Sequence, residues 1–151
     1  MHQVKIDEIG RQLQEMSTQA ILRSSLIAGK LGINLTDLEC LEVLMRLGRT
    51  TAGGLSAETG LSTGGITKMI DRLEKAGLVN REFDKSDRRK VFIVLDRAQV
   101  DQQVFPFYES LSASMNQVLT HYSPEELALI SGFLADSLKV SGEDLQQLAE
   151  L

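Results

Sequence analysis

The chain of 151 residues has no tryptophan, one cysteine, two prolines and only 5% aromatic residues. A single cysteine, Cys40, excludes an internal disulfide and a cysteine-rich zinc site. The two histidines, His2 and His121, are far apart in sequence, so we expect no metal and no cofactor. No apolar run approaches the roughly 18 to 20 residues that a membrane-spanning helix needs, and a secretory signal pattern is missing. These absences predict a cytoplasmic protein with no membrane partner.

The sequence contains no recognisable catalytic motif. No serine, cysteine or carboxylate pair stands in a nucleophile or acid–base setting, and no phosphate-binding loop occurs. The 42% hydrophobic and 25% charged residues are normal for a folded domain. We therefore expect a folded protein that binds rather than catalyses.

Positive charge is concentrated between Ser62 and Arg97. This segment holds nine basic and six acidic residues, a charge of +3, while the whole chain is at −5 and the remainder therefore at −8. A positive island on an acidic body is typical of a protein that meets DNA phosphates with one face. The alternative is an ordinary solvated surface of a charged helix and hairpin.

The two ends of the chain predict long helices with narrow apolar seams. Residues 4–29 carry such a seam at Ile6, Ile9, Leu13, Met16 and Ala20. A helix over 98–121 has a similar spacing, with Pro106 as a possible kink. Ser123 caps another helix that we expect to reach about Lys139, before Gly142 interrupts it.

The middle of the chain predicts three short helices followed by a hairpin. A capping box from Thr36 to Glu39 starts a helix over 37–47, and a second helix covers 52–59. Ser62 caps a third helix, whose inner stripe precedes the stop at Gly77. Strands are predicted over 79–83 and 89–95, joined by a polar tip over 84–88. The fold class is mainly α with a small β-hairpin.

The terminal seams are too many to be buried within one small chain. The simplest solution is a symmetric homodimer in which the terminal helices of two subunits interlock. A helix followed by a basic hairpin is a way for each subunit to address two DNA grooves.

With these features the chain resembles the MarR family of winged helix-turn-helix regulators over nearly its whole length. The resemblance rests on LSTGGITKMIDRLEKAGLV, on the hairpin sequence DKSDRRKVFIVL and on the helix order around them. It implies a homodimeric, often ligand-responsive transcription factor, usually a repressor, that binds a pseudo-palindromic operator in double-stranded DNA. One MarR-like domain would span 1–151, with dimerisation helices over 1–34 and 98–151 and the DNA-binding winged helix over 35–97. Neither the small-molecule effector nor the operator can be identified from the sequence.

The same resemblance assigns residues to DNA. The recognition helix would enter the major groove with Ser62, Thr63, Gly64, Gly65, Thr67 and Lys68. Thr67 and Lys68 have side chains suited to base edges. Two successive glycines depart from many members of the family and leave fewer side chains to read bases. They indicate either a close approach to DNA or simple tolerance near a helix end.

In the hairpin, called the wing, Arg89 would enter the minor groove, where narrow A·T-rich DNA attracts a guanidinium. We expect Lys85, Arg88 and Lys90 to contact phosphates, with Lys75 and Arg81 as weaker candidates. Asp87 is expected to hold the wing by pairing with Arg72, which is also a DNA-binding candidate. The alternative for Asp87 is a solvated turn residue.

Two competing interpretations stay open on the sequence alone. A winged helix can serve as a protein-interaction module, although clustered basic residues at 88–90 argue against that role.

Cys40 lies on a partly apolar helix face with Val43 and Leu44, which favours a buried core residue over a redox sensor.

Overall fold

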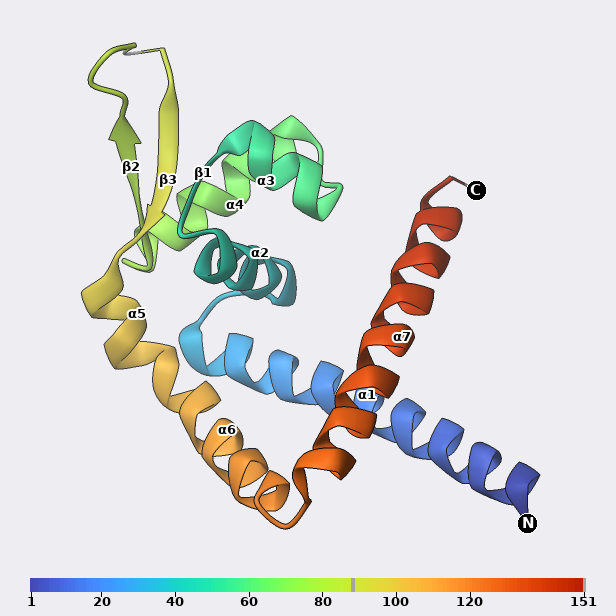
Figure 1. The fold of residues 1–151 in the computed structure, drawn as a ribbon. Helices are drawn as coiled ribbons and strands as arrows, with labels where there is room; N and C mark the ends of the chain where they lie inside the picture. Colours follow the sequence, from blue (N-terminus) through green and yellow to red (C-terminus); the bar gives the residue numbers. More distant parts are fainter. Residues whose placement is uncertain (88, 151) are drawn as a thin grey trace. The chain divides into compact units, whose positions relative to one another are not determined.

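The structure, a computed structural model, describes residues 1–87 and 89–150. These residues form seven helices and three strands (Figure 1). In chain order they are α1 (His2–Leu31), α2 (Leu35–Leu47), β1 (Arg49–Thr51), α3 (Ala52–Thr59), α4 (Thr63–Lys75), β2 (Val79–Phe83), β3 (Val91–Leu95), α5 (Arg97–Gln103), α6 (Phe105–Leu119) and α7 (Pro124–Ala149). The predicted fold class, mainly helical with a small β-hairpin, is confirmed.

The chain divides into two compact units, Met1–Phe107 and Tyr108–Leu151. In the first unit, the inner faces of α2, α3, α4 and the sheet share one hydrophobic core. Its largest fully buried side chains include Leu38, Leu41, Leu44, Leu55, Ile66, Met69, Leu73 and Ile93. Each buried leucine or isoleucine contributes about 1.5–3 kcal/mol. The core thus fixes the position of α4 against its neighbours.

A three-stranded antiparallel sheet with the order β1-β3-β2 lies beside these helices. The hairpin pairs Arg81 with Ile93 and Phe83 with Val91. Strand β1 was not predicted from the sequence, where strands were expected only over 79–83 and 89–95. Three residues are too few for an alternating pattern, and β1 exists because β3 offers it an edge, with Thr50 opposite Ile93.

Helix starts are set by side-chain caps. Ser62 accepts a hydrogen bond from the Gly65 N–H, as predicted. The predicted cap of α2 was wrong: Asn34, rather than Thr36, accepts from the Asp37 N–H at 2.8 Å and forms a capping box with Asp37. Asparagine is among the strongest N-cap residues, which moves the helix start to Leu35.

The C-terminal helices differ from their predicted lengths. The helix expected over 98–121 is two helices, because Pro106 has no N–H to continue the ladder and its ring clashes with the preceding turn. The predicted start of α7 is confirmed by a capping box between Ser123 and Glu126. The predicted interruption at Gly142 was wrong, since α7 continues to Ala149. One glycine costs about 1 kcal/mol in a helix, which neighbouring helix formers offset. None of the described helices is long and apolar enough to cross a membrane.

Candidate nucleic-acid interface

The helix α4 divides cleanly into a buried face and an exposed face. Ile66, Met69, Ile70 and Leu73 are buried in the core. Gly64, Thr67 and Lys68 lie on the opposite, exposed side. The fold therefore brings together at one helix end the residues that the sequence assigned to DNA, namely Ser62, Thr63, Gly64, Gly65, Thr67 and Lys68.

The first turn of α4 carries donors that the helix itself does not use. Ser62 accepts from the Gly65 N–H at 3.2 Å, and the Ile66 N–H donates to the Ser62 carbonyl at 2.9 Å. Within the described part of the chain, no hydrogen-bond acceptor is found for the N–H groups of Thr63 and Gly64. Free N–H groups at the positive end of a helix dipole suit a phosphate oxygen.

The hydrogen bond made by Thr67 limits which groups of a DNA base its side chain could contact. Its hydroxyl donates to the Thr63 carbonyl at 3.0 Å, so its hydrogen is already committed. What remains for a base is a pair of acceptor lone pairs and a methyl group. These suit an adenine or cytosine amino group, or a thymine methyl.

The fold does not require a glycine at position 64. A Cβ atom built there meets nothing within 4 Å, whereas one at Gly65 would lie 3.4 Å from the Ser62 hydroxyl that caps the helix. At Gly65 a side chain would thus be in contact with the capping hydroxyl, while at Gly64 the fold leaves room for one. Close approach to DNA and simple tolerance both remain open as reasons for Gly64.

The end of the wing is ordered by one carboxylate. Asp84 Oδ1 accepts from the Ser86 N–H at 2.8 Å, from the Ser86 hydroxyl at 2.5 Å and from the Asp87 N–H at 3.1 Å. These hydrogen bonds, first of all the one from the Ser86 hydroxyl, lower the pKa of Asp84 to about 2. This role of Asp84 was not predicted from the sequence, although an aspartate two residues before a serine is a signal for such a turn.

Asp87 holds the next part of the turn. Its carboxylate accepts from the Arg89 N–H at 3.1 Å, and its carbonyl accepts from the Lys90 N–H at 2.9 Å. The predicted pairing of Asp87 with Arg72 was wrong. Asp87 lies in the turn between β2 and β3, and Arg72 pairs with Asp37 on α2 instead.

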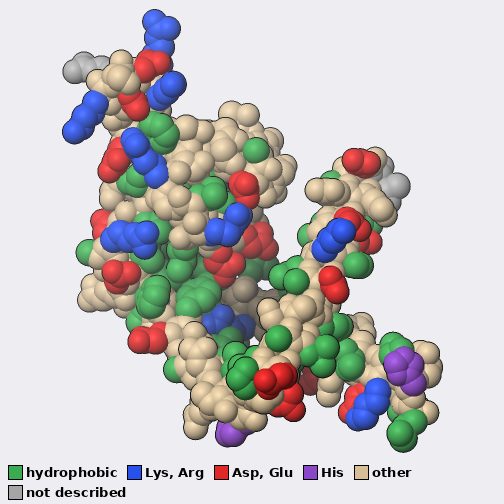
Figure 2. Space-filling model, in the orientation of Figure 1, with side chains coloured by type: hydrophobic (Ala, Val, Ile, Leu, Met, Phe, Trp, Pro, Cys, Tyr) green, Lys and Arg blue, Asp and Glu red, His purple; other side chains and the backbone are tan. Residues whose placement is uncertain are grey.

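Exposed cations surround this ordered turn. Lys85, Arg89 and Lys90 are all exposed, and Figure 2 shows Lys and Arg side chains projecting from the far end of the hairpin. Arg88 lies outside the described residues. The described residues of the wing thus combine a hydrogen-bonded turn with exposed, positively charged side chains.

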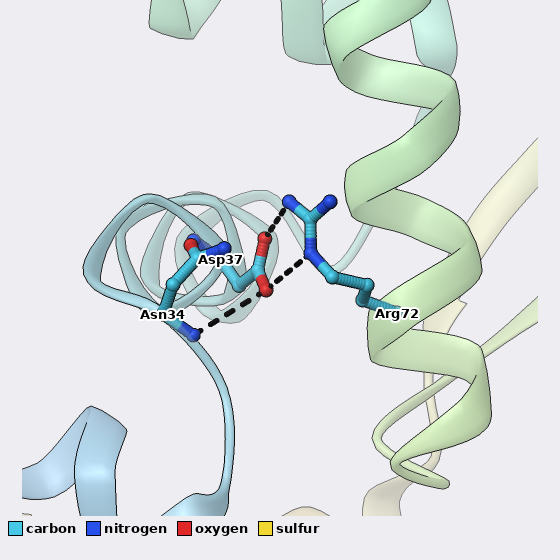
Figure 3. A network of polar contacts seen from close by, with 3 residues as sticks. All are labelled: Asn34, Asp37 and Arg72. Carbon is cyan, nitrogen blue, oxygen red and sulfur yellow. Dashed lines mark hydrogen bonds and ion pairs between the residues drawn. The ribbon is translucent and has the colours of Figure 1, made fainter.

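Arg72 instead links α4 to α2 through an ion pair, which is called the Asp37–Arg72 tie below. Its Nε and Nη2 atoms donate to the two carboxylate oxygens of Asp37, at 2.8 and 2.5 Å (Figure 3). The Asp37 side chain is completely buried, while 46% of the Arg72 side chain is exposed. The hydrogen bond to Asp37 raises the pKa of Arg72. Arg72, predicted to contact DNA, thus has its Nε and Nη2 donors occupied by Asp37.

Arg81 makes a second tie that the sequence did not predict. From β2 it donates to Asp71 at 2.5 Å and to Glu74, both on α4. Arg81, expected to be a weaker candidate for a phosphate contact, thus already has two carboxylate partners. These partners of Arg81 could be recognised only from the hairpin register, which turns Arg81 toward α4.

Cys40 is a completely buried core residue. Burial, and then the nearby charge of Asp37, raise the pKa of its thiol to about 11. A neutral, inaccessible thiol is a poor nucleophile, which supports the core interpretation over a redox sensor. Among the described residues, no group of three or more His, Cys, Asp or Glu side chains could hold a metal ion.

Comparisons with known proteins agree with this geometry. The model of the MarR family matches residues 33–91. The uncharacterized HTH-type transcriptional regulator YcgE of Bacillus subtilis is 38% identical over 91% of this chain and 88% of its own. A MarR family protein from Bacillus stearothermophilus has the same fold, with a TM-score of 0.69 and 23% identity over 94% of this chain and 99% of its own. The structure of reduced AbfR bound to DNA is similar with a TM-score of 0.52 and 24% identity, over 80% and 98% of the two chains.

Proposed function

This chain belongs to the MarR family of winged helix-turn-helix, DNA-binding transcriptional regulators, and we propose that it acts as a homodimeric, ligand-responsive repressor. Its operator is pseudo-palindromic, with one half-site for each subunit. The recognition helix α4 enters the major groove and the wing enters the adjacent minor groove. Repression and ligand response are what the family resemblance brings to this proposal.

The observation that carries the DNA-binding part is the pairing of two surfaces in one unit. The first turns of α4 offer free N–H groups with Thr67 and Lys68, and the wing offers Lys85, Arg89 and Lys90 on an ordered turn. The two surfaces differ in chemistry. Donors and acceptors on the helix suit base edges, whereas charge on the wing suits phosphates and a narrow minor groove.

The dimer is proposed because apolar side chains are left uncovered. Ile9, Leu13 and Met16 on α1 are exposed, and so are Leu129 and Leu138 on α7. Rows of this size are rare on the surface of a monomer. Residues 1–34 and 98–151 would form the dimer, and residues 35–97 would bind DNA.

An open hollow beside Arg72 supports ligand response. It has a volume of about 610 Å³ and is lined by residues of the α1–α2 link, by Asp37 and by Arg72 and Lys75 of α4. A small molecule bound there would touch the Asp37–Arg72 tie that holds α4 in place. Such a contact offers a route from ligand binding to the recognition helix.

A binding experiment tests the DNA-binding mode. Duplexes would first be selected from a random-sequence pool with the purified protein, and their affinity measured by fluorescence anisotropy at several salt concentrations. We expect an inverted repeat and an affinity that falls steeply with salt. An affinity that ignores salt, or no selected duplex at all, would instead support a protein-interaction module.

The variant Arg89→Ala tests the wing. It should weaken binding to the selected duplex by roughly 1–3 kcal/mol, the scale of one good specific contact. Unchanged affinity, with the fold intact by circular dichroism, would show that the wing does not engage DNA.

A further inference from the structure

Arg81 joins the two DNA-facing elements of the proposed interface. It lies on β2 at the base of the wing and donates through Nη2 to Asp71 and through Nη1 to Glu74 on α4. Only 29% of the Arg81 side chain is exposed. Among the ion pairs of the described residues, this is the link between α4 and the hairpin.

The two carboxylates lie on the face of α4 that is assigned to DNA. At about 100° per residue, Thr67, Asp71 and Glu74 fall within an arc of about 60°. Unpaired carboxylates at these positions would repel the phosphates that flank a groove. Arg81 neutralises part of that charge where the helix would meet the duplex.

We propose that Arg81 is a positioning residue for DNA binding: it fixes the wing relative to α4 and shields Asp71 and Glu74, without contacting DNA itself. This inference rests on the proposed function. A helix and a wing that enter adjacent grooves must keep a fixed spacing, because the grooves do. The Arg81 fork sets that spacing, since both of its terminal nitrogens are occupied by carboxylates from one helix.

The alternative is a direct phosphate contact, which basic residues of a wing commonly make. A double-mutant cycle separates the two roles, with anisotropy measured on a duplex selected by the wild-type protein. We expect Arg81→Met to weaken binding by roughly tenfold in the wild-type background, the scale of coupling within one ion-pair network. In the Asp71→Asn/Glu74→Gln background the same substitution should cost less than about twofold, because its partners are already gone.

Salt dependence gives an independent readout. Loss of a phosphate contact lowers the slope of log affinity against log salt by about 1, whereas loss of a positioning residue leaves it nearly unchanged. Because uncovered carboxylates at 71 and 74 would also alter the slope, it is compared in the Asp71→Asn/Glu74→Gln background, where we expect Arg81→Met to leave it unchanged. A slope reduced by about 1, an equal loss in both backgrounds, or full affinity of Arg81→Met would each overturn the proposal.

Arg81→Lys keeps the test decisive should the methionine variant fail to fold. A lysine serves a phosphate well, but it lacks the fork that spans two carboxylates. We therefore expect Arg81→Lys to lose affinity for the selected duplex, and wild-type affinity in this variant would contradict the proposal. Failure of the wild-type protein to select any duplex would remove the proposed function itself, which distinguishes the two failures.

Discussion

At the scale of single residues, the wing depends on the acceptor capacity of Asp84. One carboxylate oxygen takes three hydrogen bonds from Ser86 and Asp87, and the Asp84 N–H closes the turn by donating to the Lys90 carbonyl at 2.9 Å. The cations at 85, 89 and 90 therefore lie next to backbone groups that are already hydrogen-bonded without DNA. A turn that is already formed in the free protein does not have to be ordered on binding, so its ordering does not reduce the affinity for DNA.

Asp84→Ala should weaken binding to the selected duplex several-fold, although it removes a negative charge from a surface that meets phosphates. The physical reason is the loss of all three acceptor bonds, which frees the turn. Anisotropy measures the affinity, and thermal unfolding should change little because the turn is outside the core. Asp101→Ala on α5 is the matched control, since it removes the same charge from an exposed site away from the wing.

The same turn makes a prediction about pH. Because the pKa of Asp84 is lowered from 3.8 to about 2, its contribution to stability is fully present above about pH 4 and is lost as the pH falls through 2. The NMR amide signal of Ser86, which donates to Asp84, should therefore stay constant from pH 7 to about 4 and move only below that. A midpoint near 4 for this signal would show that the turn is not formed in solution.

At the scale of elements, predictions from the sequence succeed where the determining interactions are local. Ser62 and Ser123 cap helices whose first turns they contact directly, so α4 and α7 start where the sequence indicates. The short strand β1 and the partner of Arg72 were not predictable. Asp37 is 35 residues away from Arg72, and only the packing of α2 on α4 brings the two together. A local pattern cannot select one acid among many at such a separation.

The Asp37–Arg72 tie should respond asymmetrically to substitution. Arg72→Met leaves the completely buried Asp37 carboxylate without its cation and should lower the free energy of unfolding by about 3–5 kcal/mol. Asp37→Asn should cost about 1–2 kcal/mol, because Arg72 is half exposed and can be hydrated, and the amide can still accept from the Asn34 N–H. Urea unfolding measures both values. Equal losses, or a larger loss for Asp37→Asn, would contradict this account of the tie.

At the scale of the whole molecule, the unit Tyr108–Leu151 has no core of its own. Neither α6 nor α7 contains a buried residue among those the structure describes. At 100° per residue, α7 nevertheless carries two apolar stripes. One stripe holds Leu129, Phe133 and Val140, and the other holds Leu127, Leu134, Leu138 and Leu145. The 7-4-7 spacing of the second stripe is that of a coiled-coil seam, and isolated helices without such burial are only marginally stable in water. In the proposed homodimer, a second copy of the chain would supply the matching seams.

We therefore expect light scattering to give about twice the subunit mass of 16.7 kDa at micromolar concentration. Leu138→Glu should give monomers, because Leu138 is 73% exposed in one subunit and a carboxylate there would be buried in the dimer. Its affinity for a duplex with two half-sites should fall by roughly a hundredfold, while a single half-site is bound as before, since only the link between two binding events is lost. Ala135→Glu is the matched control: it adds the same charge to an exposed position of α7 that lies about 80° from one stripe and about 140° from the other. A wild-type protein that is monomeric, or a Leu138→Glu variant that remains dimeric, would exclude this seam and with it recognition of two half-sites through α7.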